Sequence, residues 1–221
     1  MIVFLIILKQ ELLLSFLNLG KILANFLFFL ISVTIFFLLA QNLENKEFTR
    51  FYSITIIWFS LIFSLIFSSI DFLKKDFEDG SIEQMLIYCK NFEVFTFAKM
   101  FANWLIYCLP ILALLPIVAL AGNLEWNFIF DFLILAFLSS LAINFICTFC
   151  GSLSIGENSA SLIGLIALPL IIPIFLIAYS GLDREGGENF CISCKILSGF
   201  VILSGAIASF ATAKIVKIIT E

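Results

Sequence analysis

The sequence predicts an all-α, polytopic membrane protein with six transmembrane helices and an N-terminal interfacial helix. Of the 221 residues, 62% are hydrophobic and 13% are charged, whereas soluble domains are about half apolar and about a quarter charged. The mean hydropathy is +1.17. Six apolar stretches each reach about 20 residues, the length that an α-helix needs to cross the hydrocarbon layer. This composition excludes a water-soluble globule, and it excludes disorder, which requires low hydrophobicity and high charge.

The first expected element is a helix at the membrane surface within residues 1–21. Residues 1–8 are apolar, and the polar positions Lys9, Ser15 and Asn18 follow at spacings that are loosely amphipathic. A signal peptide is not indicated, because the positive charge follows the apolar run and no small-residue cleavage site is present. An irregular lead-in to the first span is the alternative.

Six spans follow within one transmembrane domain, 1–221. In lipid every backbone N–H and C=O group must be satisfied within the segment, so each span is expected to be a helix. The connections between them are short and polar, which leaves no room for a soluble domain. The expected spans are 22–40, 51–70, 97–121, 128–150, 159–180 and 195–216.

Prolines interrupt two of the expected spans. Pro110 and Pro116 lie in the third span, and Pro169 and Pro173 lie in the fifth. Each proline removes a backbone donor from its helix. We therefore expect kinks in these two spans.

Small residues mark expected helix contacts. Ser60, Ser64 and Ser68 repeat every four residues in the second span, and Gly205 and Ser209 have the same spacing in the sixth. Such faces let two helix backbones approach closely. We expect them to pack within this chain rather than to form a dimer face.

The basic residues predict that both termini are cytoplasmic, because cytoplasmic loops carry an excess of Lys and Arg. Eight lie on the expected cytoplasmic side, namely Lys9, Lys21, Lys74, Lys75, Lys90, Lys99, Lys214 and Lys217. Four lie on the other side, namely Lys46, Arg50, Arg184 and Lys195.

Ionisable residues are missing from the middle of every expected span. Lys99, Asp131 and Lys195 lie near span ends, where snorkelling or water tolerates a charge. Buried ionisable groups mark proton relays and ion-coupled transporters. Their absence argues against a proton-driven secondary transporter and against a channel with charged rings. The chain has no histidine to ligate a metal or a haem, and a net charge of -4 without a basic run argues against a nucleic-acid partner.

Two CxxC pairs occur. Neither Cys147–Cys150 nor Cys191–Cys194 is followed by histidine, so neither matches the motif for covalent haem attachment. Cysteine in an apolar helix is commonly a small packing residue, and this is the interpretation for Cys147 and Cys150. A disulfide between Cys191 and Cys194 is compatible with an oxidising side of the membrane but is not favoured.

The longest polar segment is the loop 71–95 between the second and third spans. Asp79–Gly80 is a turn signal. Asp79 or Ser81 is expected to cap the helix that follows, and Glu83 falls in its first turn, where the helix dipole favours negative charge. Ile82, Met85 and Leu86 then form a short apolar face. This helix is either a plain connection with a solvated acidic face or a docking element for a cytoplasmic partner.

A resemblance to a known family favours the second interpretation, in which this helix is a docking element for a cytoplasmic partner. Residues 76–86 read Asp-Phe-Glu-Asp-Gly-Ser-Ile-Glu-Gln-Met-Leu, which resembles the acidic cytoplasmic signature of the CcmB (haem exporter B) family. That family is the membrane permease of the cytochrome c maturation ABC transporter. Three further segments are similar to the family's third, fifth and last spans, namely 97–110, 166–173 and 209–213. The resemblance covers nearly the whole chain.

The resemblance implies an ABC-2-like permease bundle that is not itself an enzyme. The chain lacks a GxxxxGK[ST] motif, since Gly20–Lys21 has neither the first glycine nor the following Ser or Thr. ATP is therefore expected on a separate ATPase subunit. The residues expected to contact that subunit are Asp76, Asp79, Gly80 and Glu83, with Met85 and Leu86 in its groove.

The resemblance also implies the wider complex. The further expected partners are a haem-handling membrane subunit, a periplasmic haem chaperone and membrane lipid, in a bacterial inner membrane. A second copy of this chain is a further candidate partner. No cofactor is assigned to this chain, because haem is handled by the complex. Met85, Met100 and Tyr179 are poor substitutes for a histidine ligand. The alternatives are an ABC permease for another lipophilic cargo, a secondary transporter and a membrane scaffold without transport.

Overall fold

The computed structural model describes residues 2–17, 19–40, 46–89, 91–122, 124–155, 160–182 and 187–220. Within these ranges the chain forms ten α-helices and no strand, which confirms the all-α prediction. The helices are α1 (Ile2–Leu17), α2 (Leu19–Ala40), α3 (Lys46–Ser69), α4 (Lys74–Glu78), α5 (Ser81–Tyr88), α6 (Phe92–Tyr107), α7 (Leu109–Ala121), α8 (Trp126–Leu153), α9 (Ala160–Ser180) and α10 (Gly187–Thr220). Asn18, Lys90, Arg184 and position 159, which the predictions used, lie outside the described residues.

Six helical segments among the described residues are long and apolar enough to cross a membrane, as predicted. Some boundaries differ. The last helix covers Gly187–Thr220 rather than 195–216, and α6 begins at Phe92 rather than at 97. These ends are polar but still helical. Glu93 lies in the first turn of α6 and Glu188 in that of α10, where the helix dipole favours negative charge, and Lys217 lies in the last turn of α10, where it favours positive charge.

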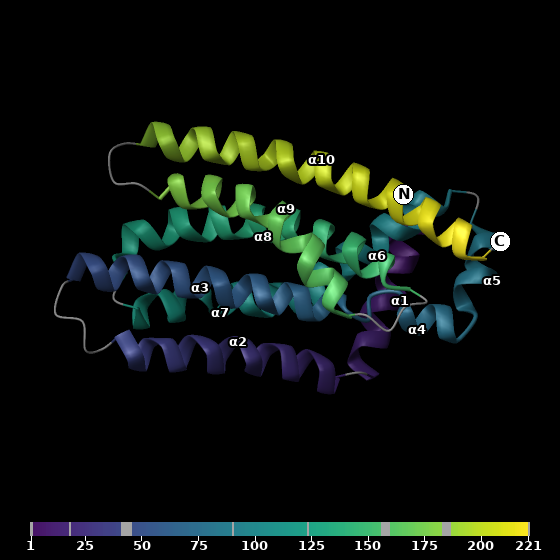
Figure 1. Ribbon diagram of the computed structural model, residues 1–221, viewed down its shortest axis with the longest axis horizontal. Coiled ribbons are helices and arrows are strands. Elements are labelled where there is room, and N and C mark those ends of the chain that lie inside the picture. Colours follow the sequence, from purple (N-terminus) through teal and green to yellow (C-terminus); the bar gives the residue numbers. More distant parts are fainter. Residues whose placement is uncertain are drawn as a thin grey trace.

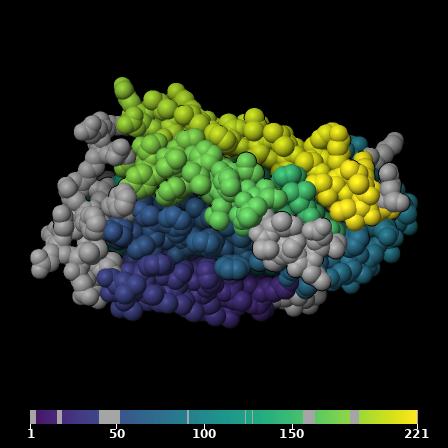
Figure 2. Space-filling view, viewed as in Figure 1, coloured from purple at the N-terminus to yellow at the C-terminus, as the bar shows by residue number. Residues whose placement is uncertain are grey.

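The helices form an elongated bundle whose long axis follows the spans (Figure 1). Both termini lie at the same end as α4 and α5, and α3 and α10 begin at the opposite end. In Figure 2, α2 forms one long edge of the visible face and α10 forms the other. Exposed apolar side chains along these two helices, such as Ile31 and Ile202, suit contact with lipid.

The core of the bundle lies between α3 and α8. Helix α8 packs against α3, α9 and α10. The fully buried Trp58 of α3 makes edge-to-face contacts with Phe132 of α8 and Phe175 of α9, at ring-centroid distances of 5.8 and 6.2 Å. Cys147 and Cys150 are buried in the same core, which confirms their packing role, whereas Cys191 and Cys194 are free thiols on α10.

The small residues pack within the chain, as predicted. Ser60 and Ser64 are buried, and the Ser64 hydroxyl donates to Asn25 Oδ1 of α2 at 3.0 Å. A Cβ atom added at Gly205 would lie 3.1 Å from the Phe145 ring of α8. The Thr96 hydroxyl of α6 donates to the carbonyl oxygen of Ser209 at 2.9 Å. These contacts join α2 to α3, and α10 to α6 and α8.

Proline divides the third span. Helix α6 ends at Tyr107, and α7 begins at Leu109 with Pro110 in its first turn, where the missing N–H costs no helical bond. Pro116 lies inside α7, and Pro169 and Pro173 lie inside α9, which continues as one helix. The predicted interruption of the third span is therefore found at Pro110.

The lead-in to the first span is a helix, not an irregular segment. Helix α1 packs against α6 and lies across the end of the bundle, transverse to α2 (Figure 1). This orientation suits a helix at the membrane surface.

Candidate functional site

The segment between α3 and α6 contains two short helices rather than one. Helix α4 ends in the turn Asp79–Gly80, and Gly80 has φ 68°, a left-handed conformation that glycine adopts without the Cβ penalty. The capping prediction was wrong: Gly80 occupies the N-cap of α5 and no side chain caps the helix. The Ser81 hydroxyl instead donates to the carbonyl oxygen of Asp76 at 3.0 Å, which ties α5 to α4.

The two faces of α5 differ from the predicted arrangement. Ile82 is fully buried, and Met85 and Leu86 are half-buried against the same apolar cluster, so these three side chains face this chain's own bundle. The outward apolar residues are Ile87 and Tyr88, which are 82% and 84% exposed.

The outer surface combines these two apolar side chains with acidic ones. Asp79 and Glu83 are exposed at the turn and in the first turn of α5. We call Asp79, Glu83, Ile87 and Tyr88 the docking surface, after the role that is proposed for it below. Ile87 and Tyr88 were not among the residues predicted from the sequence, although two apolar residues outside the Ile82–Met85–Leu86 stripe are a signal that could have identified them.

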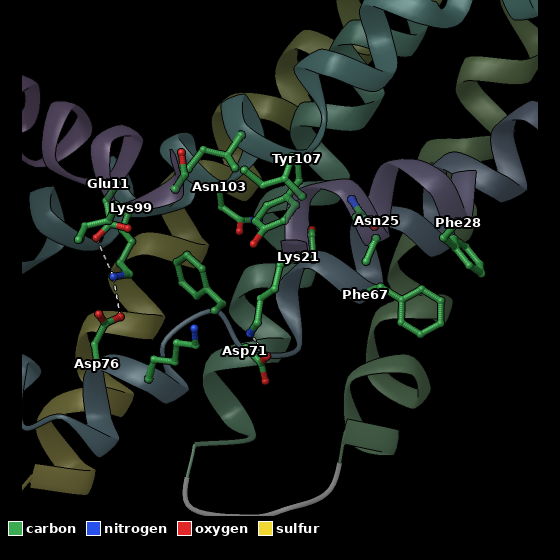
Figure 3. A pocket seen from close by; sticks show the side chains of 18 of the residues that line it. Glu11, Lys21, Asn25, Phe28, Phe67, Asp71, Asp76, Lys99, Asn103 and Tyr107 are labelled. Carbon is green, nitrogen blue, oxygen red and sulfur yellow. Dashed lines mark hydrogen bonds and ion pairs between the residues drawn. The ribbon is translucent and has the colours of Figure 1, made fainter. Parts of the chain in front are cut away.

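Asp76 points away from the docking surface. Its Oδ2 atom lies 2.5 Å from Lys99 Nζ of α6, and Lys99 Nζ also donates to Glu11 Oε1 of α1 at 2.8 Å. Figure 3 shows Lys99 between the two carboxylates. We call these three residues the Lys99 cluster. From the sequence, Lys99 was expected near a span end, where snorkelling or water tolerates its charge. Instead its side chain is 7% exposed, because α6 begins earlier than expected and α1 and α4 cover it.

A cavity of about 640 Å³ adjoins the Lys99 cluster. Its polar wall includes the ion pair between Lys21 of α2 and Asp71. Phe28 and Phe67 lie at the far end of the cavity from Lys99 (Figure 3) and contact each other edge to face at 4.9 Å. The cavity thus has a charged end and an aromatic end, which is the character of a site for an amphiphilic molecule.

A polar network fixes α6 against α8 beside this cavity. Asn103 Nδ2 donates to Asn144 Oδ1 at 3.0 Å, and Asn144 Nδ2 donates to the Met100 carbonyl oxygen at 2.9 Å. Trp104 Nε1 donates to the Ser140 hydroxyl at 3.1 Å. Buried hydrogen-bond networks of this kind hold two helices in one register.

The described part of the chain contains no group of three metal-ligating side chains. Met100 is fully buried in helix packing, Met85 is half-buried, and Tyr179 packs beside Phe175. None of these side chains reaches into the cavity.

The fold and this site define a multi-pass helical membrane protein with a structured, charged connection between its second and third spans. The chain matches the family described as CcmB protein over residues 2–219. It is 30% identical to Heme exporter protein B of Haemophilus influenzae over 208 residues. This match covers 91% of this chain and 93% of that protein. The chain belongs to the CcmB family.

Two more relatives carry the same name. Heme exporter protein B of Rhodobacter capsulatus is 26% identical over 166 residues, covering 74% of this chain and 76% of the relative. Heme exporter protein B of Pseudomonas aeruginosa is 28% identical over 164 residues, covering 74% of this chain and 73% of the relative. The resemblance that the sequence analysis drew from residues 76–86 and three spans is thereby confirmed.

Proposed function

We propose that this chain is the permease subunit of a haem-export ABC transporter that serves cytochrome c maturation. The observation that carries the proposal is family membership over residues 2–219, together with six spans and no nucleotide-binding motif in the sequence. A separate ATPase subunit supplies the energy. The bundle is of the ABC-2-like permease type.

The ATPase subunit binds the docking surface. Ile87 and Tyr88 provide apolar anchors, and exposed aromatic side chains are frequent hot spots of interfaces. Asp79 and Glu83 pair with basic residues on the ATPase, which sets register and partner choice. Gly80 gives the turn its shape. Asp76, Met85 and Leu86 support the surface from inside, because their side chains face this chain.

The docking end is cytoplasmic. Lys9, Lys21, Lys74, Lys75 and Lys217 lie on helices or turns at the end that carries both termini and α4–α5 (Figure 1), and cytoplasmic ends carry the excess of basic residues. This orientation puts the docking surface where ATP is available, in a bacterial inner membrane.

Haem handling is shared with partner subunits. With no histidine in the sequence, this chain meets haem, if at all, through apolar surface. A haem-handling membrane subunit supplies the iron ligands and passes haem to a periplasmic haem chaperone. A second copy of this chain completes the permease, since ABC transporters use two permease halves.

The test is a charge reversal on the docking surface. Asp79→Lys with Glu83→Lys should abolish co-purification of the ATPase subunit in mild detergent, while the variant still inserts in the membrane. Glu188→Lys, at the opposite end of the bundle, is the matched control and should leave co-purification unchanged. Unchanged capture by the double variant would refute docking at α5.

The Lys99 cluster favours one competing function. Buried ionisable groups in spans mark secondary transporters, and Lys99 is such a group. ATP-independent haem transport by the purified chain in vesicles would support that function. An ABC permease for another lipophilic cargo would instead require the ATPase subunit and leave cytochrome c maturation intact when the gene is deleted.

A further inference from the structure

Non-helical residues separate the α4–α5 unit from the helices on either side of it. Turn residues 70–73 join it to α3, and Cys89 and Asn91 are non-helical before α6 begins. A displacement of α5 therefore cannot pass directly to α6 along a continuous helix. Contacts between side chains offer a second route beside the backbone turn to α3.

Two kinds of contact join this unit to α6. Ile82 and Leu73 share an apolar cluster with Phe92 and Phe95 of α6, and such contacts are non-directional. The second contact is the ion pair of Asp76 with Lys99 at 2.5 Å. Because Lys99 is 7% exposed, solvent screens this pair less than a surface pair, and its geometry fixes both distance and direction.

The Lys99 cluster has two carboxylates for one ammonium group. If α4 moved away and Asp76 left, Glu11 at 2.8 Å would still neutralise Lys99. Separation would then avoid the large penalty of an unpaired buried charge. Asp76 is thus the partner that can be released, and Glu11 is the partner that is retained.

Movement imposed on Lys99 reaches the core of the bundle. One turn further along α6, Asn103 bonds to Asn144 and Trp104 bonds to Ser140, both on α8. Helix α8 in turn packs against α3, α9 and α10. Beside the non-directional apolar contacts of Ile82 and Leu73, the directional path from α4–α5 to the core therefore runs through Lys99.

We infer that Lys99 is the positioning residue that transmits displacement of α4–α5 to the spans, with Asp76 as its releasable partner and Glu11 as its retained partner. The inference rests on the proposed function, since it takes the ATPase subunit as the source of the displacement. Lys99 does not itself contact that subunit.

The experiment compares variants in the complete complex within cells. Lys99→Met removes the charge and keeps the length of the side chain. It should retain co-purification of the ATPase subunit and ATP hydrolysis, while the yield of c-type cytochrome falls about tenfold, within the range of mutations that alter coupling. Lys99→Arg should restore the yield, because guanidinium can pair with both carboxylates.

The matched control is Lys217→Met. Lys217 also reaches α6, through Glu93 at 3.9 Å, but both side chains are largely exposed. This variant should keep the cytochrome yield. If Lys99→Met fails to insert, Asp76→Asn, which retains the Glu11 pair, should give the same loss of yield with the ATPase subunit still bound.

The outcomes separate the two claims. No ATPase subunit with the unaltered chain would refute the proposed function. With the subunit bound, a normal cytochrome yield in Lys99→Met, or in Asp76→Asn if that variant is needed, would overturn the inference. Loss of the subunit from Lys99→Met would also overturn it, because Lys99 would then act on docking rather than on transmission.

Discussion

Asp76 and Lys99 form an ion pair with an Oδ2–Nζ distance of 2.5 Å, which joins the connection between two spans to the interior of the third span. The other acidic side chains of that connection, Asp79 and Glu83, are exposed. The acidic side chains of one segment thus lie in two different environments. Asp76 holds the segment to the bundle, and Asp79 and Glu83 face outward.

The apolar anchors of the docking surface can be tested directly. Ile87→Ser with Tyr88→Ser should weaken capture of the ATPase subunit at least about tenfold, since truncating one hot-spot residue costs about 2 kcal/mol or more. Tyr88→Phe keeps the ring and should retain capture. Quantitative co-purification measures the effect. Full capture by the double serine variant would show that the partner binds elsewhere.

Gly80 is expected to be required for the turn between α4 and α5. A Cβ atom at φ 68° costs about 1–2 kcal/mol even though the surrounding space is open. Gly80→Ala should therefore lower the thermal unfolding midpoint of the purified chain. Gly164→Ala, inside α9 with equally open space, should leave it unchanged or raise it. Equal midpoints for Gly80→Ala and the unaltered chain would contradict the assigned conformation.

The contact of α8 with the end of α3 depends on Gly151. A Cβ atom there would overlap the Ser69 carbonyl oxygen, and backbone cannot give way as a flexible side chain does. Gly151→Ala should cost about 1–3 kcal/mol of stability. Gly199→Ala on α10 meets nothing within 4 Å and is the matched control. Chemical or thermal unfolding in detergent compares the two variants, and similar stabilities would argue against this helix contact.

The α6–α8 network should show energetic coupling. Asn103→Ala and Asn144→Ala each remove one partner of the same hydrogen bond, so their effects on stability should not add. In membrane proteins such bonds contribute about 0.6 kcal/mol on average. A double-mutant cycle on the unfolding free energy measures this coupling. Strict additivity would mean that Asn103 and Asn144 do not interact.

The orientation of the chain in the membrane can be measured by labelling cysteine thiols at the two ends of the bundle. Cys191 is exposed at the end of the bundle opposite to α5. A membrane-impermeant maleimide should label it in cells whose outer membrane alone is permeabilised. In a Tyr88→Cys variant that carries Cys191→Ser and Cys194→Ser, the thiol should be labelled only after lysis. The reverse pattern would invert the topology.

The spans could be predicted from the sequence, because the thickness of the hydrocarbon layer sets their length and its lack of water requires apolar side chains. The helical lead-in and the break at Pro110 follow from equally local signals. The Lys99 cluster could not be predicted, since Glu11, Asp76 and Lys99 are far apart in the chain and meet only through packing of α1, α4 and α6. The expectation that Lys99 lies at a span end reached by water was wrong for this reason, since its side chain is 7% exposed.

The local structure of the connection 71–95 could be predicted only in part. The turn at Asp79–Gly80 was predicted correctly, whereas the docking role of the acidic segment stays a prediction. Met85 and Leu86 face inward, and Ile87 and Tyr88 face outward. Helical periodicity finds an apolar stripe, but it does not say whether the stripe packs on the chain itself or on a partner. The apolar cluster around Ile82 decides this, and that cluster includes residues from α1, α8 and α10.

The most direct test of the central claim is photo-crosslinking from α5 in living cells. Tyr88 is replaced by photoreactive benzoylphenylalanine, with Ile202 on the outer surface of α10 replaced in a control. If the ATPase subunit binds at α5, irradiation joins position 88 to an ATP-binding protein, identified by mass spectrometry, and position 202 gives no such product. A crosslink to that protein from position 202 alone, or to no protein from position 88, would contradict it.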